Sequence, residues 1–123
     1  MIAWYLWVNA ALYGVFAVLC SLRVAATARS LGYTQLNASG MSEYVTVYGG
    51  LQFGLAVFFA WAAYRPELQR VGLLLAVCLY MPIVVFRWLS VMRHWPVERM
   101  TLAVGALEAT LLAVALGLWF KVR

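Results

Sequence analysis

Four long apolar runs, the last three separated by short charged segments and the first two by a longer connection, constrain the fold of this chain more than any other feature. The runs cover residues 2–22, 44–64, 71–92 and 101–120. A helix needs about 20 apolar residues to cross the hydrocarbon core of a membrane, and each run meets that length. The segments 65–70 and 93–99 each combine charges with a proline, which is typical of a short turn between two helices.

The composition agrees with a membrane location. The chain has 123 residues, of which 67% are hydrophobic and 11% are charged, and its mean hydropathy is +0.90. A soluble domain of this size has too little interior to hide so much apolar surface. We therefore expect an integral membrane protein in which residues 1–123 form a single transmembrane domain.

None of the four runs alternates apolar and polar residues, as the strands of a membrane barrel do. Helices satisfy their own backbone hydrogen bonds in lipid, and short connections place successive helices antiparallel. The predicted fold class is therefore all-α, an integral membrane up-down-up-down four-helix bundle.

The charged residues indicate membrane flanks and not a nucleic-acid surface. The net charge is +5, from nine Lys and Arg against four acidic residues. The basic residues stand singly between apolar runs and form no stripe. Four of them fall on each predicted side of the membrane, so their count does not set the orientation. The N-terminal amine adds one positive charge to its side, and on this ground we expect both termini in the cytoplasm.

Polar side chains interrupt or border the last three runs at similar depths. At about 1.5 Å per residue, antiparallel threading places them all within roughly 12 Å of one membrane surface. These candidate cluster residues are Glu43, Tyr48, Gln52, Arg87, Ser90 and Glu108. A charge that faces lipid is costly, so Arg87 and Glu108 should both point into the bundle. Glu108 is the simplest partner for Arg87, and Glu43 is the competing partner.

Three interpretations of this polar cluster remain open. The first is a structural network of ion pairs and hydrogen bonds that fixes the register of the helices. The second is a pocket for a lipid headgroup, a quinone or another amphiphile, in which Arg87 holds the polar end while Tyr48 and Gln52 orient it. The third is a path for protons or ions, for which intramembrane Glu and Arg are the usual material.

Small residues beside the cluster predict close helix packing. The glycines assigned to this role are Gly49, Gly50, Gly54 and Gly105. Gly50 and Gly54 form a GxxxG pattern, which lets two helices approach closely either inside the bundle or between protomers, and of these we expect packing inside the bundle.

No catalytic motif is present in the sequence. It contains no Gly-rich phosphate loop, no GxSxG and no Cys/His pairing. Cys20 and Cys78 each lie in an apolar run without a CxxC partner, and His94 has no second histidine with which to bind a metal. We therefore expect no catalytic residue, no cofactor and no metal, and a role that is not enzymatic.

The segment "EYVTVYGGLQFGLAVFF", the later "FRWLSV" and the Glu-bearing fourth run resemble small bacterial four-span membrane proteins of unknown function, which are similar to the DoxX-like group. The residues that carry the resemblance are Glu43, Tyr48, Gly49, Gly50, Gly54, Arg87, Ser90 and Glu108. One departure is "RHWPVER", which stands where such proteins often have an acidic-Gly turn. The resemblance implies a bacterial inner membrane and supports the same polar cluster, but it carries no activity.

The expected function is binding of an amphiphile, lipid or quinone, or of a partner transmembrane helix, through the polar cluster in one leaflet. The alternative is a small oligomeric transporter of protons, ions or a solute that uses Glu108 and Arg87. Membrane lipid is the expected partner, with a second copy of the chain or another membrane protein as the alternative, and no nucleic acid.

Overall fold

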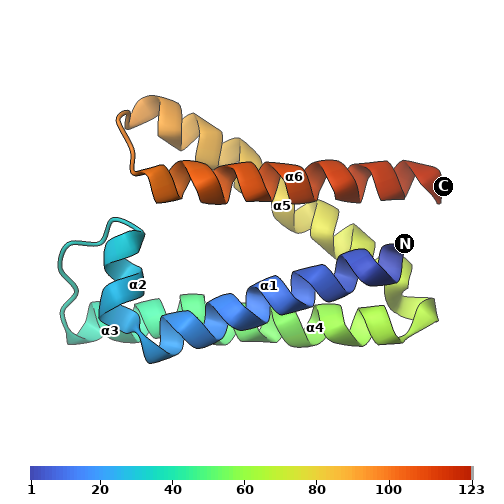
Figure 1. The fold of residues 1–123 in the computed structure, drawn as a ribbon, viewed down its shortest axis with the longest axis horizontal. Coiled ribbons are helices and arrows are strands. Elements are labelled where there is room, and N and C mark those ends of the chain that lie inside the picture. The colour runs from blue at the N-terminus through green and yellow to red at the C-terminus, as the bar shows by residue number, and fades with distance from the viewer. Residues whose placement is uncertain (123) are drawn as a thin grey trace.

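The computed structural model describes residues 1–122, and all of the secondary structure in this range is helical (Figure 1). The elements, in order, are α1 (Ile2–Leu22), α2 (Val24–Ser30), α3 (Ala38–Tyr44), η1 (Val45–Leu51), α4 (Gln52–Tyr64), η2 (Pro66–Leu68), α5 (Gln69–Arg93) and α6 (Arg99–Lys121). The element η1 is a π-helical segment, and η2 is a single 3₁₀ turn.

Four helical segments are long and apolar enough to cross a membrane. They are Ile2–Leu22, Ala38–Tyr64, Pro66–Arg93 and Arg99–Lys121. The second segment is continuous through α3, η1 and α4, and it begins six residues before the predicted start at residue 44. The reason is an N-cap that the hydropathy pattern does not reveal, since the Asn37 side chain accepts a hydrogen bond from the Gly40 backbone N–H at 2.8 Å.

The long helices run along one axis of the molecule, with α5 inclined to the others. Figure 1 shows α1 and α4 side by side, with α5 crossing obliquely between this pair and α6. Both chain ends lie at one end of the molecule, which we call the terminus end. The helix α2, the helix α3 and the turn between α5 and α6 lie at the opposite end, which we call the loop end.

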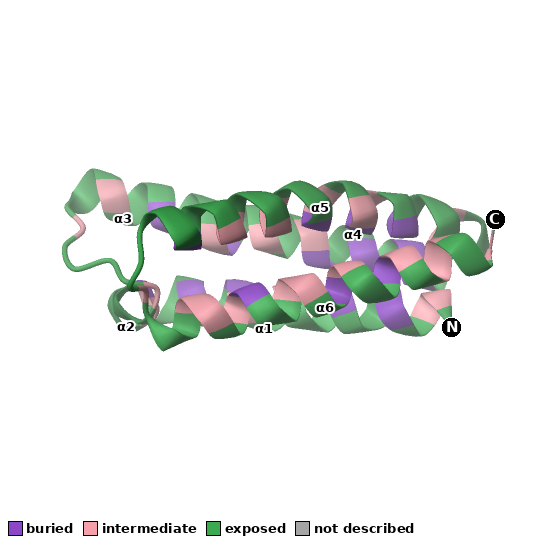
Figure 2. Cartoon of the chain, turned by 90° about the horizontal axis from the view of Figure 1, so that it is seen from above, coloured by how far each residue is buried: buried purple, intermediate pink, exposed green. Residues whose placement is uncertain are grey.

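The main hydrophobic core joins all four long helices near the terminus end. It is built from Tyr5, Leu6, Ala10, Phe59, Ala62, Ala63, Leu73, Ala76, Tyr80, Leu111 and Ala115. Figure 2 shows the buried positions concentrated toward this end. At its centre Gly72 allows α5 to approach α4 and α1, because a Cβ atom on Gly72 would lie 2.8 Å from the Ala62 Cβ and 3.1 Å from the Leu6 side chain.

A second, smaller core lies at the loop end and contains no residue of α5 or α6. Its buried members are Cys20, Ala28 and Tyr44, and Phe16 and Tyr48 are among the side chains packed against them. The two cores divide the molecule: α5 and α6 are held to α1 and α4 mainly at the terminus end. At the loop end the first half of the chain packs on itself.

Candidate functional site

The Arg87–Glu108 ion pair is the centre of the candidate site. Arg87 Nε donates to Glu108 Oε2, and Arg87 Nη2 donates to Glu108 Oε1 at 2.8 Å. The contact is therefore two-pronged, the geometry in which a guanidinium matches a carboxylate best. The pair joins α5 to α6, and it confirms the partner predicted for Arg87 from sequence depth. The side chains are 29% and 14% exposed, so the arginine is the more open member.

Gly105 makes room for this ion pair. It lies one turn before Glu108 on α6, and a Cβ atom there would stand 2.8 Å from Arg87 Cδ and 3.4 Å from the Trp88 ring. The missing side chain lets the arginine stem cross the surface of α6 to reach the carboxylate. The packing role predicted for Gly105 is present, and its local partner is the Arg87 side chain.

Tyr48 belongs to a group of tyrosines at the loop end. Its hydroxyl lies 3.2 Å from that of Tyr33, and its ring stacks on Tyr44 with a centroid distance of 4.6 Å. Tyr44 is fixed in turn, because its hydroxyl donates to Thr27 Oγ1 at 2.9 Å. Tyr44 and Tyr48 thus belong to the smaller core at the loop end.

The other three residues of the predicted polar cluster do not join the Arg87–Glu108 ion pair. Glu43 is exposed on α3, and neither of the two ion pairs formed within residues 1–122 includes it. Ser90 is exposed, and its Oγ lies 3.3 Å from Nδ1 of His94, the residue that follows its own helix. Gln52 is half-buried, and no hydrogen bond of its side chain is formed with another described residue. The competing pairing of Arg87 with Glu43 is therefore wrong, because Glu108 takes two N–H groups of Arg87 while Glu43 stays exposed on α3.

The four predicted packing glycines do not act alike. Gly49 is buried against α1, where a Cβ atom would clash with Ser21 Oγ. Gly50 and Gly54 face outward, and a Cβ atom on either would meet nothing within 4 Å. Packing of the GxxxG pair inside the bundle was therefore a wrong prediction. The physical reason is that α1 packs beside the Gly49 face of the segment, so the Gly50 and Gly54 face is left open.

Sequence reasoning missed a second buried polar network, located between the ion pair and the terminus end. Asn9 is fully buried; its Nδ2 donates to the Tyr5 carbonyl at 2.8 Å, and its Oδ1 accepts from the Tyr80 hydroxyl at 2.5 Å. The Tyr5 hydroxyl donates to the Leu111 carbonyl at 3.0 Å. This network ties α1 to α5 and α6. Asn9 was the available signal, as a lone amide deep inside an apolar run, but its tyrosine partners looked like ordinary aromatic residues.

Two shallow hollows lie on the outer face of α1 and α4, away from the ion pair. One has a volume of about 520 Å³ and is lined by Val57, Ala60, Trp61, Tyr64 and Arg65. The other, of about 370 Å³, adjoins it and is lined by Trp7, Ala10, Ala11, Ala56, Val57 and Ala60. Neither includes a residue of the predicted cluster. Across residues 1–122, no group of three or more His, Cys, Asp or Glu side chains is placed to hold a metal ion.

Comparison of the chain with protein-family models, with curated proteins and with solved structures finds no match.

Proposed function

We propose that this is an integral membrane protein that binds an amphiphile, a lipid or a quinone, through the Arg87 end of its ion pair, and that its role is not enzymatic. In this proposal the four long helices cross the bilayer in an up-down-up-down bundle. The observation that supports this proposal best is that the Arg87 side chain is still partly exposed although it is paired with Glu108. A pair that served structure alone needs no guanidinium that is 29% exposed.

The unused hydrogen-bonding capacity of Arg87 supports this proposal. A guanidinium has five N–H donors, and Glu108 takes two of them. No buried side-chain nitrogen or oxygen in residues 1–122 lacks a partner. Arg87 Nη1 makes no hydrogen bond to the described chain, so it must be accessible from outside.

Native mass spectrometry of the protein released from gentle detergent tests the proposal. We expect a co-purified amphiphile that is retained by the wild type and by Arg93→Gln, a control at the exposed end of the same helix. We expect it to be reduced about tenfold or more in Arg87→Leu/Glu108→Leu, which removes both charges and strands neither. Equal ligand content in the folded double variant and the wild type would leave the pair with a structural role only.

A second candidate function, proton or ion transport by an oligomer, is favoured by one observation. The Tyr80 hydroxyl donates to Asn9 Oδ1, Asn9 Nδ2 donates to the Tyr5 carbonyl, and the Tyr5 hydroxyl donates to the Leu111 carbonyl on α6, the helix that carries Glu108. Polar groups thus continue from the ion pair toward the terminus end. A flux across proteoliposomes that disappears in Glu108→Gln and persists in Glu43→Gln would support transport over binding.

For the cellular setting we propose a bacterial inner membrane with both termini in the cytoplasm. The supports are the resemblance to small bacterial four-span proteins and the N-terminal amine, since the basic side chains divide equally between the two sides. A neighbouring membrane protein or a second copy of the chain remains the alternative partner, and the open face at Gly50 and Gly54 leaves room for its helix.

A further inference from the structure

The two shallow hollows on the outer face of α1 and α4 join into one groove, because Val57 and Ala60 line both of them. We call it the alanine groove, after the small residues that line it where the two helices meet, which are Ala10, Ala11, Ala56 and Ala60. Their short side chains leave the surface hollow between larger neighbours. The groove lies away from the Arg87–Glu108 ion pair and is therefore a separate feature of the molecule.

The alanine groove faces outward and not into the core. Trp7 on α1 and Trp61 on α4 line it, and both side chains are exposed. The two helices belong to segments that are long and apolar enough to cross a membrane, Ile2–Leu22 and Ala38–Tyr64. In a membrane, an apolar hollow on this face is filled by hydrocarbon.

The length of the alanine groove matches one leaflet of a bilayer. On the second segment, Ala56 is its innermost residue and Arg65 its outermost, nine positions apart, which is about 14 Å at about 1.5 Å per residue. The hydrocarbon core is about 30 Å thick, so one leaflet takes up about 15 Å. A transmembrane helix would need a matching face about twice as long as this groove. A lipid acyl chain is therefore the occupant that the groove fits.

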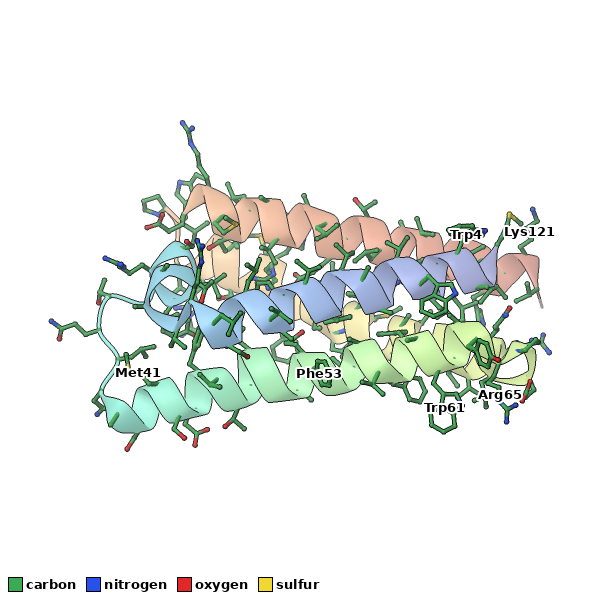
Figure 3. All side chains as sticks on the ribbon, turned by 60° about the horizontal axis from the view of Figure 1, so that its bottom comes forward. Trp4, Met41, Phe53, Trp61, Arg65 and Lys121 are labelled. Atoms are coloured by element: carbon green, nitrogen blue, oxygen red, sulfur yellow. The ribbon has the colours of Figure 1, made fainter. Side chains whose placement is uncertain are left out.

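The outer end of the alanine groove is positively charged. Figure 3 shows Arg65 and Lys121 at this same end of the molecule. Arg65 Nε lies 3.3 Å from Glu67 Oε1, but both side chains are more than half exposed, and such a pair holds the arginine only weakly. With Arg70, the described part of this end carries three basic side chains and one acidic side chain. A phosphate complements this charge, and the guanidinium fork of Arg65 fits its oxygens.

From these observations we infer that the alanine groove binds an anionic phospholipid, with one acyl chain in the groove and the headgroup phosphate on Arg65. Tyr64 lines the groove next to Arg65 and is exposed, as suits an aromatic side chain at the level of the headgroups. The inference shares the membrane-spanning helices with the proposed function, but it concerns a different site at the opposite end of the molecule.

Two phospholipids with the same acyl chains test the inference. Dioleoyl phosphatidylglycerol carries a net negative charge, and dioleoyl phosphatidylcholine carries none. Both are mixed in equal amounts in nanodiscs that hold the full chain, and the lipid retained on the released protein is measured by native mass spectrometry. We expect the wild type to retain phosphatidylglycerol at least about fivefold more than phosphatidylcholine, because each basic side chain at a membrane surface adds to the attraction of an anionic lipid.

Matched variants locate the bound lipid. Arg65→Gln should lower the preference for phosphatidylglycerol about threefold or more, and Arg93→Gln, the same change at the loop end, should leave it unchanged. Ala60→Leu fills the groove where its hollows meet and should lower retention about fivefold or more, because the acyl chain loses its packing contacts. Ala11→Leu fills the groove from an exposed position, so it tests the site even where Ala60→Leu disturbs folding. Ala103→Leu, exposed on α6, is the control for added bulk.

Three results would overturn the inference. The first is retention that none of the variants Arg65→Gln, Ala60→Leu and Ala11→Leu changes. The second is loss of phosphatidylglycerol in Arg87→Leu/Glu108→Leu with full retention in Arg65→Gln, which would place the lipid at the ion pair and leave the proposed function standing. The third is a wild-type dimer that dissociates in Ala11→Leu, which would assign the groove to a second copy of the chain.

Discussion

The buried and half-buried polar side chains Arg87, Glu108 and Asn9 each form a hydrogen bond or an ion pair with a side chain on another helix. Arg87 and Glu108 are each costly in lipid, and together they form a neutral, hydrogen-bonded unit. Asn9 shows the same rule without charge, because both ends of its amide are satisfied although the residue is fully buried. Each polar residue therefore depends on one specific neighbour.

At this scale we predict that Asn9→Leu destabilises the protein. The change leaves the buried Tyr80 hydroxyl without its acceptor, and we expect the free energy of unfolding to fall by about 1–2 kcal/mol. Tyr80→Phe is the matched control, since it removes the other side of the same bond. The double variant should lose less than the sum of the two single losses, as measured by thermal unfolding in detergent. Strictly additive losses would show that the two side chains do not interact.

Glycines decide how closely the helices of this protein approach one another, and their effect depends on the face they occupy. Gly72 stands where α5 meets α4 and α1, so there is no room for a side chain. Gly54 lies on the open face of α4, where a side chain meets no other part of the chain. The π-helical segment η1 places Gly49 toward α1, and π-helical turns are often found beside functional positions.

We predict opposite effects for two alanine substitutions. Gly72→Ala should lower the free energy of unfolding by about 1–3 kcal/mol, because the new methyl group would overpack against Ala62 and Leu6. Gly54→Ala should be neutral or stabilising by up to about 1 kcal/mol, since alanine is the better helix former and has space. Melting temperatures of both variants in the same detergent check the pair. A loss at Gly54 as large as that at Gly72 would mean that the open face is covered.

The whole molecule has apolar sides and polar or aromatic ends, as a membrane-spanning protein requires. Figure 3 shows Trp4 and Trp61 near the terminus end, where Arg65 and Lys121 also lie, and Met41 at the opposite end. Trp4 and Trp61 are more than half exposed, at 77% and 61%, which suits residues at a membrane–water boundary. The molecule is joined most tightly at the terminus end, and the proposed ligand site lies nearer the loop end.

The topology makes a prediction at this scale. In a background of Cys20→Ser and Cys78→Ser, the substitutions Glu67→Cys and Gln35→Cys place single thiols in two exposed connections at opposite ends of the molecule. We expect a membrane-impermeant maleimide to label them from opposite sides of sealed vesicles. Labelling of both from one side would contradict the bundle in which all four helices cross.

The sequence by itself determined the helical character of the chain, the number of long apolar helices and the approximate place of each. These follow from the length and hydrophobicity of continuous runs, which are local properties. The sequence also indicated the Arg87–Glu108 pair, because two lone opposite charges at one depth have little choice of partner.

Only the tertiary structure decided which faces of these helices meet. The apolar residues surround each helix on all sides, so hydrophobicity does not say whether Gly49 or Gly50 faces α1. Nor does it show that Asn9 finds its partner in Tyr80, 71 positions away in the chain. Such pairings depend on how whole helices pack, and lipid accepts an apolar face as readily as another helix does.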